Sequence, residues 1–147
     1  MSARGFHRVL VGWDSSPGAA AALAAATAIA DDEVGRVVAL AVLRPVSRGE
    51  GSEEERAAEI ARHQQQTAEA FAKARDTLPG TSRATVTLEF AEGADAAREL
   101  CEYADAHVFE LLVLGRHGKG GVLHPRLGHV AEAVAKKSVL PLLLLGS

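Results

Sequence analysis

The sequence predicts an α/β fold in which a parallel β-sheet has helices on both faces. Short apolar runs of strand length alternate five times with longer segments of helical pattern, as expected for successive β-α-β units. Several runs, such as VVALAVL and LLVLG, are almost continuously aliphatic, whereas a sheet with one solvated face would alternate apolar and polar residues. The predicted strands are Arg8–Trp13, Arg36–Leu43, Ala84–Phe90, Glu110–Gly115 and Val139–Leu145.

The first helix is predicted to begin directly after the first strand. Ser16 is a suitable N-cap, and Pro17 falls at the first helical position, where its missing N–H is tolerated. The alanine-rich sequence that follows predicts a helix that continues to Asp31.

The longest helix is predicted after the second strand and a polar, turn-rich segment. Ser52 and Glu55 form a candidate capping box, and Pro79 with Gly80 ends the helix at Leu78. Its inward stripe is expected to consist of Ala57, Ile60, Ala61, Gln64, Thr67, Ala68, Phe71 and Leu78.

Two shorter helices complete the alternation, at about Ala94–Ala106 and His129–Lys137. Lys136 and Lys137 lie at the carboxyl end of the second of these, where positive charge is favoured by the helix dipole.

Length and composition predict one domain over residues 1–147, since 48% of the 147 residues are hydrophobic and a second domain of usual size would not fit. A net charge of −3 gives no general attraction to nucleic acid or to an anionic membrane. The single cysteine, Cys101, fits a reducing compartment, and neither a signal peptide nor a long apolar run is visible. We therefore expect a cytoplasmic location.

The most informative segment is a glycine-rich loop between the fourth strand and the last helix. Gly115, Gly118 and Gly128 are separated by two and nine residues, and the basic residues Arg116, Lys119 and Arg126 lie among them. Glycine permits close approach of a ligand to the backbone, and a helix N-terminus presents unpaired N–H groups beside a partial positive charge. These properties favour phosphate binding.

This spacing resembles the nucleotide-binding signature of the universal stress protein family. The family also opens with an apolar strand that ends in an aspartate and a serine-proline turn, as in Val9–Pro17 (VLVGWDSSP), and its last strand carries a proline among aliphatics, as in Val139–Leu145. The likeness covers nearly the whole chain. It implies a doubly wound, Rossmann-like sheet with strand order 3-2-1-4-5.

The resemblance also implies a binding site for an adenine nucleotide. Asp14 and the main chain of Val42 would hold the nucleoside, and the glycine loop would surround the phosphates. Trp13 offers a wide ring that could wall the base, although packing at the strand end explains it equally well. The candidate nucleotide-binding residues are Gly12, Trp13, Asp14, Val42, Leu114, Gly115, Gly118, Gly128, His129 and Val130.

His129 departs from the family pattern, because the ATP-binding members have serine or threonine at this position. Histidine keeps the backbone N–H but lacks the compact hydroxyl, and Ala131 also lacks the hydroxyl often found two positions later. A protonated imidazole can pair with phosphate. Alternatively, the ring fills the phosphate space and leaves a site for adenosine, AMP or nothing. ATP and AMP therefore both stay candidate ligands, with Mg²⁺ expected only together with bound nucleotide.

Neither a catalytic residue nor a dedicated metal site can be named. His117, His124 and His129 match no zinc-ligand spacing. The chain also lacks a P-loop, a GxGxxG fingerprint, a GxSxG elbow and a Cys/His pairing. Any ATP hydrolysis should be slow.

The resemblance implies a dimeric stress-response sensor or regulator that binds an adenine nucleotide. The apolar run Val139–Leu145 is expected to be an edge strand through which two copies pair. Two alternatives stay open: an interaction module whose phosphate site is degenerate at His129, and a slow nucleotide hydrolase.

Overall fold

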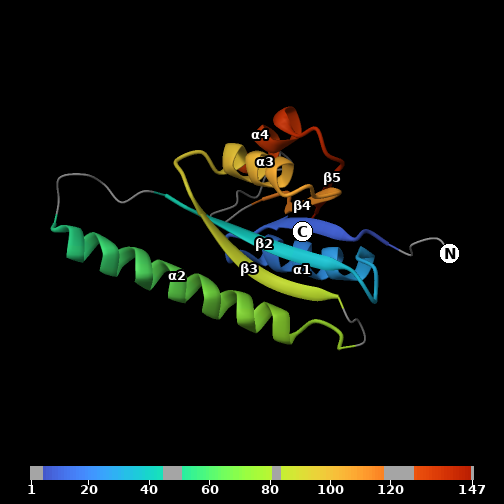
Figure 1. Cartoon of the computed structure of the whole chain (residues 1–147), viewed down its shortest axis with the longest axis horizontal. Coiled ribbons are helices and arrows are strands. Elements are labelled where there is room, and N and C mark those ends of the chain that lie inside the picture. Colours follow the sequence, from blue (N-terminus) through green and yellow to red (C-terminus); the bar gives the residue numbers. More distant parts are fainter. Residues whose placement is uncertain (1–4, 45–50, 81–83, 118–127, 147) are drawn as a thin grey trace.

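A five-stranded parallel sheet organises the chain in the computed structural model, which describes residues 5–44, 51–80, 84–117 and 128–146 (Figure 1). The strands are β1 (Arg8–Gly12), β2 (Arg36–Leu43), β3 (Thr85–Glu92), β4 (Leu111–Gly115) and β5 (Leu142–Leu145). The helices are α1 (Pro17–Ile29), α2 (Glu53–Asp76), α3 (Ala96–Ala106) and α4 (His129–Lys137). The order across the sheet is β3-β2-β1-β4-β5, with every neighbouring pair parallel. The predicted α/β class and strand order are confirmed.

The core lies on both faces of the sheet, as the aliphatic strands predicted. Val9 and Val11 of β1 belong to a buried cluster with residues of α1 and α2, whereas Leu10 belongs to a second cluster with residues of α3 and α4. In Figure 1, α2 lies below the sheet and α3 and α4 lie above it. Because successive side chains of a strand point to opposite faces, an uninterrupted aliphatic run fills both layers.

The last strand is shorter than predicted. It begins at Leu142, so Val139 and Pro141 precede it, and the side chain of Val139 is 87% exposed. Proline has no N–H to donate to the ladder. The Ser138 hydroxyl donates to the carbonyl of Leu140 and accepts from the N–H of the same residue, which makes a local turn in place of strand pairing.

The first helix is also shorter than predicted, since it ends at Ile29. Asp31 is part of the turn that follows, where its carboxylate accepts hydrogen bonds from the N–H groups of Glu33 and Val34. Aspartate competes for nearby backbone donors in this way, and the competition favours a turn over a further helical residue.

The inward stripe expected for the longest helix is only partly correct. Phe71 is the one buried residue of α2, while Ala57, Ala61 and Ala68 are exposed. A helix of 24 residues is about 36 Å long, but a strand of eight residues such as β2 spans only about 26 Å. The amino-terminal half of α2 therefore extends past the end of the sheet, as Figure 1 shows.

None of the helices in the described segments is long and apolar enough to cross a membrane.

The turn between α3 and β4 holds a valine in a strained conformation. Val108 has a φ of 54°, in the left-handed region, and the N–H of Phe109 returns to the carbonyl of Ala104 at 3.1 Å. Glycine usually occupies this position after a helix. The Arg8 guanidinium braces the turn, because it donates to the carbonyls of His107 at 2.8 Å and Val108 at 3.1 Å.

Val108→Gly is expected to raise the free energy of unfolding by about 0.5–1 kcal/mol, because relief of the left-handed strain exceeds the extra entropy of glycine in the unfolded chain. Little packing is lost, since the side chain is 74% exposed. Urea unfolding measures the change. Val139→Gly is the matched control, because Val139 is 87% exposed and does not have a positive φ, so glycine there should destabilise the protein. A Val108→Gly protein less stable than wild type would contradict this account.

Candidate functional site

The candidate residues gather where the carboxyl ends of the strands meet the amino ends of α1 and α4. Gly12 ends β1, Gly115 ends β4 next to it, and the N–H of Gly128 donates to the carbonyl of Arg116. The two ends of the glycine-rich loop therefore lie together, beside the start of the turn that leads into α1. This edge of an open α/β sheet, beside the change in strand order, is the usual place for a ligand.

Asp14 caps the turn that leads into α1. Its Oδ1 accepts a hydrogen bond from the N–H of Ser16 at 3.0 Å, and the Ser16 hydroxyl in turn accepts from the N–H of Ala19 at 3.1 Å. Ser15 between them has a φ of 65°. Asp14 therefore has a structural role as a turn-capping carboxylate, and its exposed side chain lies at the site edge.

Gly115 is required by a close contact with the first turn of α1. A Cβ on Gly115 would lie 2.8 Å from the carbonyl carbon of Gly18, and a Cβ on Gly18 would lie 2.7 Å from the carbonyl oxygen of His117. The two glycines let the helix backbone rest directly on the end of β4. Gly18 was not among the predicted site residues, and a glycine within an alanine-rich helix was the signal that could have revealed it.

Gly12 and Leu114 form the floor of the same edge. A Cβ on Gly12 would overlap the Cδ2 methyl of Leu114, so the leucine side chain fills the space above the glycine. Leu114 is 4% exposed and belongs to the core cluster with residues of α3 and α4. The floor is therefore apolar and packed.

The main chain of Val42 faces the space beyond the end of β1. The N–H of Trp13 donates to the carbonyl of Leu40, whereas the carbonyl of Leu43 accepts from the N–H of Gly93, after β3. Residues of a parallel strand bond alternately to its two neighbours. The backbone N–H and C=O of Val42 therefore point toward the β1 side of β2, as those of Leu40 do. Leu40 is opposite Gly12, the last residue of β1, so Val42 lies beyond the end of that strand.

The amino end of α4 presents backbone donors without a side-chain cap. Gly128 is the N-cap and makes no side-chain capping bond, and His129 and Val130 are both exposed in the first turn. The first N–H groups of a helix have no partner within the helix and lie at the positive end of its dipole. This end of α4 can therefore accept an anionic group.

The middle of the glycine-rich loop lies outside the described residues, and so do the predicted site residue Gly118 and the basic residues Lys119 and Arg126. Arg116 is described, and its side chain lies against Gly146, where an added Cβ would be 3.6 Å from the arginine Cδ.

In the described segments, no group of three or more His, Cys, Asp or Glu side chains is placed to hold a metal ion. His117 and His129 belong to these segments, whereas His124 does not.

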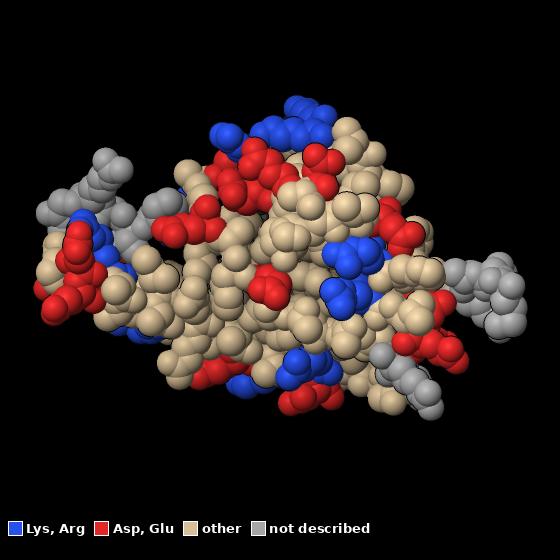
Figure 2. Space-filling model, in the orientation of Figure 1, with Lys and Arg blue, Asp and Glu red and all other residues tan. Residues whose placement is uncertain are grey.

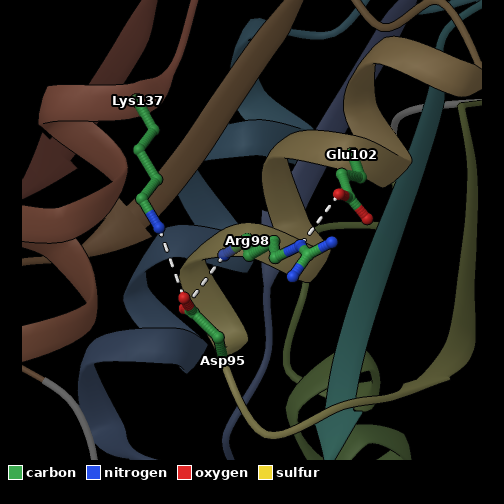
Figure 3. Close-up of polar contacts among 4 residues, drawn as sticks. All are labelled: Asp95, Arg98, Glu102 and Lys137. Carbon is green, nitrogen blue, oxygen red and sulfur yellow. Dashed lines mark hydrogen bonds and ion pairs between the residues drawn. The ribbon is translucent and has the colours of Figure 1, made fainter.

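An exposed ion pair links the end of α4 to the start of α3 (Figure 3). Lys137, at the end of α4, contacts the carboxylate of Asp95 at 3.2 Å, and Asp95 is the N-cap of α3 because it accepts from the N–H of Arg98. That hydrogen bond, followed by the lysine, lowers the pKa of Asp95 below its ordinary value. A second pair, between Arg98 and Glu102, lies along α3. Sequence patterns give no signal for a pair 42 residues apart.

Charges of both signs are mixed over the face seen in Figure 2, where Lys and Arg side chains stand beside Asp and Glu. The face in this view is therefore not a basic surface.

The model of the universal stress protein family matches residues 5–146. A search of the curated proteins finds no match. Among solved structures, the hypothetical protein MJ0577 is 22% identical, with a TM-score of 0.80 over 97% of this chain and 96% of its own. A universal stress protein in complex with cAMP is 23% identical, with a TM-score of 0.68 over 99% and 98% of the two chains.

A universal stress protein from Archaeoglobus fulgidus, solved in complex with dAMP, is 20% identical and has a TM-score of 0.65 over 95% of this chain and 97% of its own. Similarity at these identities shows a common fold. The family match extends over nearly the whole length, from before β1 to after β5. The chain therefore belongs to the universal stress protein family.

Proposed function

We propose that this protein binds an adenine nucleotide at the carboxyl edge of the sheet and acts as a dimeric sensor or regulator in a stress response. The observation that carries the proposal is the convergence of the polar main chain of Val42, beyond the end of β1, and the uncapped start of α4 on one edge. A nucleoside needs directional donors and acceptors, and its phosphate needs unpaired N–H groups.

The proposed roles follow the geometry. Val42 and Asp14 hold the nucleoside, and the N–H groups of His129 and Val130 face the phosphate, together with the backbone of Gly128. Gly12 and Leu114 form the apolar floor, and Gly115 lies where β4 turns into the loop. Trp13 and Gly118 stay predicted site residues, and Gly118 lies outside the described residues. Relatives with this fold were solved with cAMP and with dAMP, which supports an adenosine monophosphate as ligand.

AMP is expected to bind more readily than ATP, because His129 supplies a backbone N–H without a hydroxyl for further phosphates. Mg²⁺ is expected only with bound nucleotide. We propose no catalytic residue, so hydrolysis of ATP should be slow at most. One alternative stays open, an interaction module of the same fold that binds no nucleotide, because His129 lacks the hydroxyl of the family pattern.

Calorimetric titration with AMP and ATP tests the proposal. Wild type is expected to bind AMP, and His129→Ser is expected to bind ATP about tenfold more tightly than wild type, because a hydroxyl adds one hydrogen bond to a charged phosphate. Asp14→Ala should weaken AMP binding.

His107→Ser is the matched control for this titration, since His107 is also exposed but lies after α3, at the opposite edge of the sheet. It should bind both nucleotides as wild type does. Absence of heat with both nucleotides, for wild type and for His129→Ser, would support the interaction module instead.

We also propose that two copies pair through β5. This strand is at the edge of the sheet, where its outer backbone groups face away from β4. Leu143 within it is 36% exposed and Val139 just before it is 87% exposed, so apolar surface lies along an open strand. Such an edge readily pairs with a second strand, and a twofold axis covers both copies at once.

A further inference from the structure

Trp13 carries a buried hydrogen-bond donor without an acceptor. The side chain is 4% exposed, and no partner lies within reach of its indole Nε1 in the parts of the chain that the structure describes. A buried donor left in this state costs about 1–3 kcal/mol of stability. Native proteins hold few such groups, and each calls for a physical explanation.

Trp13 directly follows β1, at the edge of the sheet that holds the candidate site, and its side chain belongs to the core on the α2 side of the sheet. Trp13 follows Gly12, the last residue of β1, and its backbone N–H still donates to the carbonyl of Leu40 in β2. The backbone polar groups of Val42 lie further along β2, past this bond. The ring packs edge-on against Phe71 of α2, with centroids 5.6 Å apart and planes at 87°. This contact holds the orientation of the indole.

We propose that the indole N–H of Trp13 is a donor for the bound nucleoside, with a ring nitrogen of the base or a ribose oxygen as its acceptor. The proposal rests on the proposed function, because it assigns a further hydrogen bond to the same site. The donor has already lost its water in the unbound protein. Binding therefore gains the hydrogen bond without a second desolvation of the N–H, and this gain offsets part of the cost of moving the groups that cover it.

The acceptor can reach this nitrogen only when the groups that cover it shift. The element most able to shift is α2, because Phe71 is its one buried residue and its amino-terminal half extends past the sheet. Nucleoside binding should therefore change the contact between the rings of Trp13 and Phe71 and, at the same time, give the indole N–H a hydrogen-bond acceptor.

Nuclear magnetic resonance tests the proposal directly, because Trp13 is the only tryptophan and gives a single indole N–H signal. Addition of AMP is expected to move this signal downfield and to slow its exchange with solvent. Adenine and ribose 5-phosphate, added separately, distinguish a base acceptor from a ribose acceptor. The proposal is overturned if AMP shifts the backbone signals of His129 and Val130 while the indole signal keeps its position and its exchange rate.

Two changes at position 13 separate the N–H from the packing of the ring. Replacement of the indole by benzothiophene, which has sulfur in place of the N–H, keeps the size of the ring and should weaken AMP binding about 3- to 10-fold. Stability should stay the same or rise, since the unsatisfied donor is removed. Trp13→Phe should weaken binding similarly, with some loss of stability from its smaller ring.

Equal AMP affinity of the benzothiophene protein and wild type would overturn the proposal and leave the nucleotide site intact. Absence of any signal change with AMP in the wild-type spectrum would overturn both the nucleotide site and this donor. A purely structural role of Trp13 predicts unchanged AMP binding for the isostere, whatever its stability, so the affinity decides between the two roles.

Discussion

Gly115→Ala is expected to lower the free energy of unfolding by about 1–3 kcal/mol, the usual range for overpacking a filled interior. The added methyl group would lie 2.8–2.9 Å from backbone atoms of Gly18. Backbone in the first turn of a helix cannot rotate away as a long side chain can, so α1 must separate from the end of β4. The same shift moves the turn that holds Asp14, and AMP binding should weaken with stability.

Urea unfolding followed by circular dichroism measures the loss. Gly80→Ala is the matched control, because a Cβ there would meet nothing within 4 Å and the residue does not have a positive φ. Alanine at this position should be neutral or slightly stabilising, since it reduces the freedom of the unfolded chain. If the two alanine variants are equally stable, the contact between α1 and β4 does not require glycine at position 115.

The sequence predicted the layers of this fold because both signals for them are local. The aliphatic runs mark strands buried on two faces, and the cap at Ser16 followed by Pro17 marks the start of α1, where the structure confirms it. The ends of elements were less accurate. Val139 belongs to no strand because Ser138 and Leu140 make a turn instead. Asp31 follows α1 because its carboxylate accepts hydrogen bonds from the backbone after it.

Interactions between distant residues explain most of what the sequence could not predict at the candidate site. Gly115 was expected to be glycine because a ligand would approach its backbone. Gly18, 97 residues earlier in the sequence, already excludes a side chain at this position.

The predicted stripe of α2 followed helical periodicity correctly, but periodicity does not reveal that the helix is longer than the strands beneath it. Phe71 packs on the sheet and is buried, whereas Ala57 lies in the half of α2 that extends past the sheet and is exposed.

Leu143→Lys is expected to convert the proposed dimer into a monomer, with a dissociation constant raised about 100-fold or more. Leu143 is 36% exposed in the single chain, so a lysine there can extend into solvent and the fold should persist. In a dimer paired through β5 the same side chain lies against the second copy. A buried ammonium group without a partner is costly, and the twofold axis introduces it twice.

Sedimentation velocity over a range of protein concentrations measures the change, and circular dichroism checks that the variant is folded. Val34→Lys is the matched control, because Val34 is an apolar side chain with 62% exposure in the turn before β2, away from β5. Wild type and Val34→Lys should sediment as dimers. A wild type that is monomeric at every concentration would exclude pairing through β5. A Leu143→Lys protein that stays dimeric would place the interface elsewhere, because no strand-to-strand contact beside Leu143 could hold two unpaired ammonium groups at so little cost.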